Sequence, residues 1–334
     1  MKDGAKTLEF EITKDGEMVD LTSKDTSIAN QVIRGGVKVQ KRDIETGETK
    51  PQGNATLEGA TFTITNLSTH PVLVNEKLYE SGQVVLTLKT DKSGAAATAK
   101  DALPYGHYRI DETEAPDGYL NEGKLSQEFD IQENSKIIDL TSKEHAIFNQ
   151  IIRGDLEFVK VSDGDLNRLA NVPFSITSKT TGESHTIVTD KNGYASTSAE
   201  WNKHTANTNR GETSEDGIWF GTSKPDDSKG ALIYDTYILE EQRCETNEGM
   251  NLLKIEVEVY RNHVVIDMGT LTDDRITIGT TALDKDTESH LSKPEEKITI
   301  IDTVEYEGLK KGQSYKLLGT CLLYTSDAAD DLIG

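Results

Sequence analysis

A stretch of fifteen residues occurs twice in this chain of 334 residues. It reads SIANQVIRGGVKVQK at 27–41 and AIFNQIIRGDLEFVK at 146–160. Asn149 follows Asn30 by 119 residues, and Lys160 follows Lys41 by the same distance. A long self-similar period is typical of stacked domains. We therefore expect tandem modules, with an Asn near the end of one module and a Lys near the start of the next.

The repeat divides the chain into segments. Leu8–Arg34 repeats the end of the first full module, Glu128–Arg153, with EFEI against EFDI and DLTSK in both copies. Asn30 is then expected to be an orphan acceptor, belonging to a module whose front half precedes this sequence. The expected segments are the end of a preceding module at 1–35, a full module at 36–153, a divergent second module at 154–275 with a polar insertion at 201–227, a truncated domain at 276–320, and a tail at 321–334.

The tail has an unusual sequence. Cys321–Asp331 reads CLLYTSDAADD, which resembles a transposase-based sequencing adapter translated in frame. We therefore expect residues 321–334 to be a sequencing artefact and exclude them from reasoning about the fold. Cys244 then remains as a lone cysteine, which is expected to be a small buried hydrophobe and not a nucleophile.

The composition excludes several kinds of partner. With a net charge of -22, the chain is not expected to bind nucleic acid or an anionic membrane, because phosphate groups favour clustered Lys and Arg. The cysteines lie in no CxxC context and the histidines have no metal-ligand spacing, so neither a disulfide scaffold nor a metal site is indicated. No apolar run reaches the roughly 18 residues that indicate a membrane span. No cofactor is expected.

Short alternating runs bounded by turn residues dominate the chain and indicate β-strands. Asp91–Gly94 (DKSG) and Asp190–Gly193 (DKNG) are matching turn sequences in the two modules. About seven short strands in roughly 110 residues favour a β-sandwich, so the expected fold class is all-β, with tandem immunoglobulin-like sandwiches. In the first full module the strand signals lie at 37–41, 60–65, 84–89, 107–111, 128–131, 136–139 and 146–149.

Three polar side chains of the first full module are expected to face its core. Side chains alternate along a strand with a period of two, so Lys41 shares a face with the two valines of VKVQK. By the same rule Glu112 points inward with Ile110, and Asn149 points inward with Ile147. Burying a lone lysine costs several kcal/mol, which pairing with a carboxylate only partly offsets. Desolvation favours a neutral amine beside a protonated acid.

Lys41, the ETEAPDGY stretch that begins at Glu112, and Asn149 together resemble a known family. They are similar to the SpaA-type, or collagen-adhesin B-type, prealbumin-like domains of Gram-positive surface proteins and pilins. The resemblance covers Gly36–Gln150. It implies an intramolecular isopeptide bond, with Lys41 as nucleophile, Asn149 as acceptor and Glu112 as the catalytic acid that shuttles protons. Ammonia would leave, in a single turnover.

The second module departs from the family pattern. Lys160 repeats Lys41, but the Glu motif has become YILEEQRCETNEG, in which Glu241 matches Glu112 and Glu240 is the alternative. Counting back from Gly279, as from Gly154 to Asn149, gives Asp274 as the acceptor, with Asp273 as the alternative. An aspartate acceptor would release water.

The third segment resembles the ester-bond domains that accompany such modules, through IGTTALDKDT and IIDTVEYEGLKKGQSYKLLGT. In those domains a Thr on the first strand bonds a Gln near the domain end. The resemblance implies Thr280 as nucleophile, with Thr281 as alternative, and Asp302 as the acid. The Gln, a His and a further Glu are expected beyond residue 320. A structural role for the adjacent threonines in a strand is an equally good interpretation.

The resemblance implies a function outside the cell. We expect a stalk segment of an adhesin or pilin-like protein that is associated with the cell wall, stabilised by Lys–Asn and Lys–Asp bonds, and not an enzyme acting on an external substrate. It would attach to peptidoglycan through an anchor outside this sequence. Its alternative is an adhesin module that contacts a host extracellular-matrix protein or glycan through the insertion at 201–227. A spacer in a secreted hydrolase is a third possibility.

Overall fold

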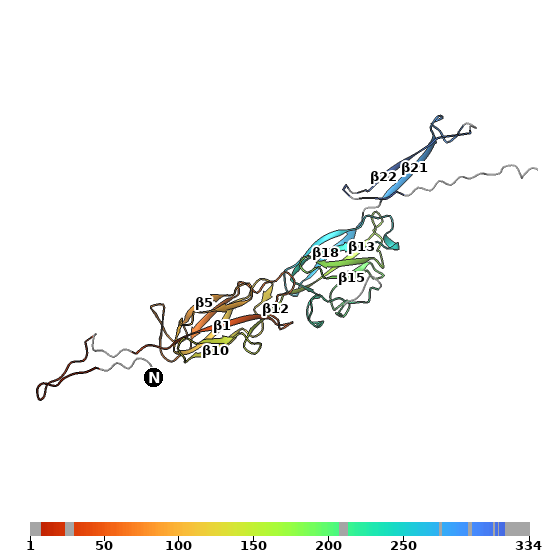
Figure 1. The fold of residues 1–334 in the computed structure, drawn as a ribbon. Helices are drawn as coiled ribbons and strands as arrows, with labels where there is room; N and C mark the ends of the chain where they lie inside the picture. The colour runs from red at the N-terminus through yellow and green to blue at the C-terminus, as the bar shows by residue number, and fades with distance from the viewer. Residues whose placement is uncertain are drawn as a thin grey trace, which may run out of the picture.

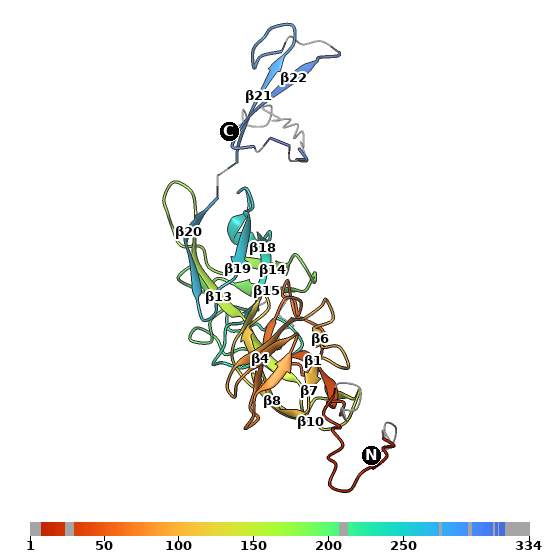
Figure 2. The same cartoon turned by 90° about the vertical axis from the view of Figure 1, so that its left-hand side faces the viewer.

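The computed structural model describes residues 8–23, 30–206, 213–273, 276–292, 296–309, 311–312 and 314–317. These residues form two β-sandwiches, a two-stranded hairpin and one short 3-10 helix. The two sandwiches and the hairpin follow one another end to end in an elongated array (Figure 1). Figure 2 shows the same order from a second side. The predicted all-β sandwich architecture is confirmed.

The first sandwich contains twelve strands. They are β1 (Arg34–Asp43), β2 (Thr61–Asn66), β3 (Val72–Val74), β4 (Lys77–Tyr79), β5 (Val84–Lys89), β6 (Ala95–Ala97), β7 (Leu103–Pro104), β8 (Gly106–Glu114), β9 (Tyr119–Leu120), β10 (Ser126–Ile131), β11 (Ile137–Leu140) and β12 (Ile147–Ile151). In one sheet β1 pairs with β6, β7, β11 and β12, and β9 pairs with β12. The facing sheet has the order β10-β8-β2-β5. The core between the sheets includes Val39, Phe62 and Ile110, all fully buried.

The first and last strands of this sandwich lie side by side. Strand β1 pairs with β12 in parallel, with Lys41 opposite Ile147 and Asp43 opposite Asn149. Side chains of alternate residues share a face, so Lys41 and Asn149 both point into the core, and both are 0% exposed. The strand pairing therefore brings the two ends of the module together at one buried position.

The second sandwich repeats this plan. Its strands are β13 (Arg153–Val161), β14 (Pro173–Ser178), β15 (Ser184–Val188), β16 (Tyr194–Ser196), β17 (Leu232–Ile233), β18 (Asp235–Glu241), β19 (Lys254–Val259) and β20 (Val265–Thr272), with the 3-10 helix η1 at Glu245–Asn247. The sheets are β16-β13-β17, with β20 pairing β13 in parallel, and β15-β14-β18-β19. The single strand β20 takes the place that β11 and β12 share in the first sandwich.

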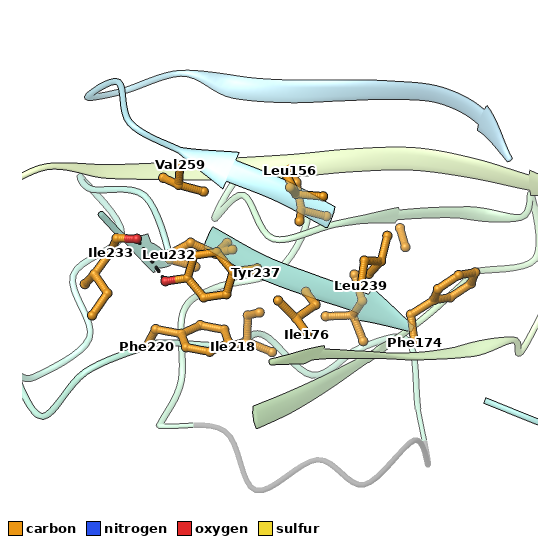
Figure 3. Close-up of a cluster of buried hydrophobic side chains, with 14 of the residues drawn as sticks. Leu156, Phe174, Ile176, Ile218, Phe220, Leu232, Ile233, Tyr237, Leu239 and Val259 are labelled. Carbon is orange, nitrogen blue, oxygen red and sulfur yellow. Dashed lines mark hydrogen bonds between the residues drawn. The ribbon is translucent and has the colours of Figure 1, made fainter. Parts of the chain in front are cut away.

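Small details of the two sandwiches also match. The hydroxyl of Tyr108 donates to the carbonyl of Pro104 at 2.9 Å, and that of Tyr237 donates to the carbonyl of Ile233 at 2.9 Å (Figure 3). Both predicted turns are confirmed, since the side chains of Asp91 and Asp190 each accept a backbone N–H two residues ahead at 2.8 Å. The repeat in the sequence is therefore a repeat in three dimensions.

The insertion at 201–227 differs from the surface loop that its polar composition predicted. Ile218, Trp219 and Phe220 are at most 2% exposed. Ile218 and Phe220 lie beside Tyr237 in the core of the second sandwich (Figure 3), with the rings of Phe220 and Tyr237 5.0 Å apart. Burial of each large apolar side chain contributes about 1.5–3 kcal/mol. The free energy gained by burying these three consecutive side chains therefore draws this part of the insertion into the core, although the residues around it are polar.

The segment before β1 does not reproduce the structure of its sequence copy. Residues 8–23 form no strand, although the corresponding residues of the first sandwich form β10 and β11. Phe10 is 57% exposed, whereas its counterpart Phe129 is 5% exposed. Strands β10 and β11 are held by pairing with β8 and β1, and no described strand pairs with residues 8–23. A β-favouring sequence forms a stable strand only where a partner covers it.

The C-terminal part that the structure describes is an antiparallel hairpin of β21 (Thr277–Asp284) and β22 (Ile300–Glu307). It lies past the second sandwich in both views (Figures 1 and 2). Across the described ranges, no helix has the length and apolar character needed to cross a membrane.

Candidate functional site

Lys41 sits near the end of β1 with no solvent contact. Its Nζ donates to Glu112 Oε2 at 2.8 Å, and both side chains are 0% exposed. The ring of Phe62 lies on another side of Nζ, with its centroid 6.0 Å away. A charged amine in this position has one carboxylate partner and otherwise apolar surroundings, so its charge is poorly solvated.

Glu112 reaches the lysine from the facing sheet. It lies on β8, opposite Phe62 of β2, and therefore points across the sandwich toward β1 and β12. Asn149 of β12 donates from Nδ2 to the same Glu112 Oε2 at 2.9 Å and to the carbonyl of Leu120 at 2.8 Å. The structure thus brings together all three residues that the sequence predicted, because Lys41 and Asn149 both donate to one carboxylate oxygen of Glu112.

Two oxygen atoms of this cluster accept no hydrogen bond from any described residue. Within the described part of the chain, Glu112 Oε1 and Asn149 Oδ1 are buried and have no hydrogen-bond partner. A buried acceptor without a partner costs about 1–3 kcal/mol. A proton placed on Glu112 would supply a donor inside the cluster and reduce this cost.

Burial shifts both titratable groups of the cluster toward their neutral forms. Desolvation lowers the pKa of Lys41 to about 8, against the attraction of Glu112. Desolvation also raises the pKa of Glu112 above its ordinary value, although Lys41 and Asn149 oppose the rise. Transfer of one proton from Lys41 to Glu112 therefore costs far less here than in water.

The arrangement can support a condensation between Lys41 and Asn149. A neutral Nζ is a nucleophile, and the Asn149 amide donates to the same Glu112 oxygen that Nζ contacts. Glu112 can take the proton that the amine loses and deliver it to Nδ2, which already contacts the carboxyl group. A C–N bond would form from Lys41, the Asn149 C–N bond would break, and ammonia would leave. Fixed proximity of this kind replaces binding of a second reactant.

The register of the second sandwich identifies the equivalent acceptor. Lys160 of β13 lies opposite Leu271 of β20, as Lys41 lies opposite Ile147. In the first sandwich the acceptor follows that opposite residue by two positions. The same step from Leu271 leads to Asp273, which is 1% exposed and has Oδ2 2.8 Å from the Nζ of Lys160.

Asp273 is thus the residue that contacts the lysine, whereas the count along the sequence had favoured Asp274. Asp274 itself lies outside the described residues. The two counts differ because the connection from Asp273 to Gly279 is one residue longer than that from Asn149 to Gly154. A count from the following module cannot detect such an extra residue, whereas strand register does.

The register also distinguishes the two candidate acids. Glu241 lies opposite Phe174, as Glu112 lies opposite Phe62, and its carboxyl group is fully buried 4.0 Å from the Nζ of Lys160. Glu240 points outward, where its side chain is 45% exposed and pairs with Lys254 at 3.3 Å. Glu241 is therefore the counterpart of Glu112.

The second cluster is connected differently from the first. The Nζ of Lys160 contacts Asp273 and donates to the carbonyl of Val161 at 2.9 Å. The Nζ of Lys41, in contrast, contacts the acid, Glu112. Burial and the neighbouring Asp273 raise the pKa of Glu241 to about 7. Glu241 is therefore partly protonated at neutral pH, and the acid needed for loss of water is in place.

One residue that positions this acid could not be recognised from the sequence. Asn247 of η1 is fully buried and donates to Glu241 Oε1 at 2.9 Å. The backbone N–H of Leu253 donates to Oε2 at 3.2 Å. Asn247 lies in an irregular segment, where no strand period marks which side chains point inward.

The remaining predicted residues are exposed. Thr280 lies opposite Val304 in the hairpin, so Asp302, two residues before Val304, lies diagonally across from it on the same face. Thr281 points to the other face. Asn30 is exposed, unlike its counterpart Asn149. Among the described residues, no closed site forms around these side chains.

Two family models match parts of the chain. Residues 35–145 match SpaA, a prealbumin-like fold domain, and residues 276–331 match the T-Q ester bond containing domain. The first match includes Lys41 and Glu112 and ends before β12, while the second includes Thr280 and Asp302. No curated protein matches the chain.

Solved structures of surface proteins and pilins show similarity over most of the chain. The Bacillus anthracis TIE protein is 25% identical with a TM-score of 0.44, over 72% of this chain and 34% of that chain. The minor pilin GBS52 of Streptococcus agalactiae is 17% identical with a TM-score of 0.26, over 72% and 96%. A C-terminal fragment of the pilus adhesin SpaC from Lactobacillus rhamnosus GG is 15% identical with a TM-score of 0.36, over 72% and 98%.

This chain spans about a third of the length of the TIE protein. The domain content follows from the family models, which agree with the motifs at Lys41 and Thr280. The chain therefore contains one region that is similar to SpaA prealbumin-like domains and one that is similar to T-Q ester-bond domains.

Proposed function

We propose that this chain is a load-bearing stalk segment of a surface adhesin or pilin-like protein, in which each sandwich closes one intramolecular isopeptide bond. Lys41 bonds to Asn149 in the first sandwich, and Lys160 bonds to Asp273 in the second. Each reaction occurs once and consumes the protein's own side chains. The chain is then a structural protein and not an enzyme with an external substrate.

One observation carries this proposal. The amine of Lys41 and the amide nitrogen of Asn149 both contact a single oxygen of Glu112, and all three side chains are buried. Replacing a buried ion pair by well-packed apolar residues often leaves the folded protein equally stable or more stable. The cost of burying these groups is therefore best explained by the reaction that they can carry out.

The strand plan explains what the bonds would do. Tension on a tandem array pulls on the first and last strands of each sandwich, which here are the neighbours β1 and β12 or β13 and β20. A covalent bond between these strands transmits the force directly from one to the other. The residues between the bonded positions then carry no load, so the module is not unfolded by pulling.

This role supports an extracellular site for the protein. We propose that the protein is attached to the cell wall, with peptidoglycan as the anchor and a host protein or glycan as the distant partner. A covalently closed, cysteine-poor sandwich withstands mechanical load without depending on the redox state of its surroundings.

Intact mass spectrometry of the folded chain tests the bonds. Each Lys–Asn bond removes ammonia, about 17 Da, and each Lys–Asp bond removes water, about 18 Da. We expect a total deficit of about 35 Da relative to the sequence. An unchanged mass for the folded protein would refute the proposed cross-links.

Two glutamine variants separate the two sites. Glu112→Gln should abolish only the loss of ammonia, and Glu241→Gln only the loss of water, because each removes one proton carrier with little change in shape. Glu114→Gln is the matched control, since Glu114 lies on the same strand as Glu112 but is exposed and contacts the hydroxyl of Thr61 at 2.8 Å. A full mass deficit in Glu112→Gln would show that Glu112 is not the proton carrier.

A further inference from the structure

A second cluster of buried charges lies where the two sandwiches meet. Glu45 follows β1 of the first sandwich, and its side chain is 3% exposed. Arg153 begins β13 of the second sandwich, and its side chain is 1% exposed. The guanidinium donates to both carboxylate oxygens, with Nη2 to Oε2 at 2.7 Å and Nε to Oε1 at 2.9 Å. This is a bidentate ion pair between two modules, in an almost dry setting.

The insertion holds the other side of Arg153. The guanidinium carbon lies 3.7 Å from the ring centroid of Trp219, and Nη2 donates to the carbonyl of Phe220 at 3.0 Å. Ser223 receives a hydrogen bond from Nη2 at 3.2 Å and donates to Glu45 Oε2 at 2.9 Å. The insertion thus touches both members of the pair, one from each sandwich.

The insertion is itself anchored in the second sandwich. Ile218 and Phe220 are part of its core (Figure 3), and the ring of His185 packs edge-on against Phe220 at 4.6 Å. The backbone N–H of Gly221 donates to the carboxylate of Glu183 at 3.0 Å. Trp219 is therefore held in a fixed place over the guanidinium and does not project into solvent.

An apolar contact supports the same junction on another side. Ala55 and Tyr119 of the first sandwich belong to the same buried cluster as the core of the second. The backbone N–H of Asn54 donates to the carbonyl of Tyr234 at 2.9 Å. A Cβ at Gly118, which has φ +85, would lie 2.8 Å from the ring of Tyr234, so the ring and that turn approach as closely as glycine allows.

The junction also contains a lysine, a side-chain amide and a carboxylate, the same combination of groups as the proposed cross-linking site of the first sandwich. The Nζ of Lys229 contacts Gln150 Oε1 at 2.8 Å and Glu45 Oε1 at 3.3 Å. Burial raises the pKa of Glu45, but the hydrogen bonds and charge of Arg153, together with hydrogen bonds from Gln150 and Ser223, lower it to about 2. Glu45 is therefore ionised at neutral pH and has no proton to deliver, so this trio remains an ionic contact.

We propose that Glu45, Arg153 and Trp219 form a clamp that fixes the relative orientation of the two sandwiches, and that the insertion serves this junction. The clamp is independent of the isopeptide bonds, which stiffen each sandwich from within. A bidentate arginine–carboxylate pair with a stacked ring accepts only a narrow range of geometries. Buried as it is, the pair specifies the orientation of the modules more than it stabilises either one.

Small-angle scattering and tryptophan quenching on the full chain test the clamp. The scattering distance distribution reports how widely the two sandwiches sample their relative orientation. Acrylamide quenching in a Trp201→Phe background reports access to Trp219. For Glu45→Gln and Arg153→Met we expect a broader distance distribution and a severalfold increase in the quenching constant. Arg153→Met removes the guanidinium that covers the Trp219 ring, and Glu45→Gln removes the carboxylate that holds this guanidinium in place.

The matched control is Glu48→Gln, which changes the same loop but removes an exposed ion pair with Lys143. It should leave both readings unchanged. Peptide mapping for the two isopeptide bonds shows whether each sandwich still folds, so a variant that merely unfolds is recognised. Wild-type readings in both clamp variants, with both sandwiches folded, would overturn the proposal. A broad wild-type distribution equal to that of the variants would overturn it as well.

Discussion

At the scale of single residues, the described part of the chain contains three buried sites in which an amine or guanidinium meets a carboxylate: one at Lys41, one at Lys160 and one at Arg153. Burial favours the neutral forms of Lys41 and Glu112 in the first sandwich and of Glu241 in the second. Arg153 cannot lose its proton and keeps Glu45 ionised. The residue types alone do not separate reactive from static clusters. The balance between desolvation of the charged groups and their pairing distinguishes the two kinds of cluster.

These protonation states predict the pH dependence of cross-linking. The first sandwich reacts while Lys41 and Glu112 share one proton, so its rate should fall about tenfold per pH unit above the Lys41 pKa of about 8. The second needs a proton on Glu241, so its rate should begin to fall near pH 7. Chain kept denatured since synthesis would be refolded at each pH, and the two bonds followed by peptide mapping.

In that experiment the second sandwich should lag behind the first as the pH rises from 7 to 9. Rates that do not vary with pH would show that proton transfer is not part of the reaction. A lag of the first sandwich behind the second would contradict the assigned acids.

The sequence revealed these residues to different degrees. Lys41, Glu112 and Asn149 were recognisable because each lies on a strand whose period of two shows its direction. Asn247 and Glu45 lie in irregular segments, where no period applies. The choice between Asp273 and Asp274 as acceptor depended on the connection to Gly279, which is one residue longer than its counterpart in the first sandwich. Only the strand pairing reveals this difference.

At the scale of elements, the central feature is the parallel pairing of the first and last strands of each sandwich. The seven strands predicted in the first sandwich correspond to β1, β2, β5, β8, β10, β11 and β12, because their alternating patterns are bounded by clear turns such as Asp91–Gly94. The short strands β3, β4, β6, β7 and β9 were not predicted. Residues 8–23 form no strand, although their sequence repeats that of β10 and β11, because no described strand pairs with them. The burial of 218–220 was missed, because this apolar triplet lies within a polar insertion. The triplet, with one of only two tryptophans in the chain, was the available signal.

The closed first sandwich should be much more stable than an open one. The proposed bond between Lys41 and Asn149 would close a loop of roughly 100 residues, which in the entropic model contributes about 4–5 kcal/mol. Glu112→Gln should therefore lower the melting temperature of the first sandwich by on the order of 15–20 °C. Calorimetry, with hydrogen exchange to assign the transitions, measures this difference.

Glu114→Gln again serves as the control and should melt like the wild type. Glu241→Gln should shift only the transition of the second sandwich. Equal melting temperatures for Glu112→Gln and wild type would mean that no covalent closure stabilises the first sandwich.

At the scale of the whole molecule, two kinds of device act together in the elongated array (Figure 1). Covalent bonds would stiffen each sandwich along its length, and the clamp would keep the two sandwiches aligned. The modular order was predictable from the repeat in the sequence. The clamp was not, because its members come from three segments that only the fold brings together.

The clamp should resist mild acid. A carboxylate with a lowered pKa contributes stability above its unfolded pKa, about 4.3, and loses this contribution as the pH falls through its folded value. For Glu45 that value is about 2, and the groups around it are Arg153, Lys229, Gln150, Gln52 and Ser223. Quenching of Trp219 should stay low down to about pH 4 and rise between pH 4 and 2. A rise already at pH 6 would contradict the ionised state assigned to Glu45.

The most direct test of the account is a tryptic digest of the folded wild-type chain. A bond at Lys41 blocks cleavage there and joins Val39–Arg42 to Glu144–Arg153 in one branched peptide, with a deficit of about 17 Da. Fragmentation should place the branch at Lys41 and Asn149. Recovery of Glu144–Arg153 only as a free linear peptide, from chain shown to be folded, would contradict the central claim.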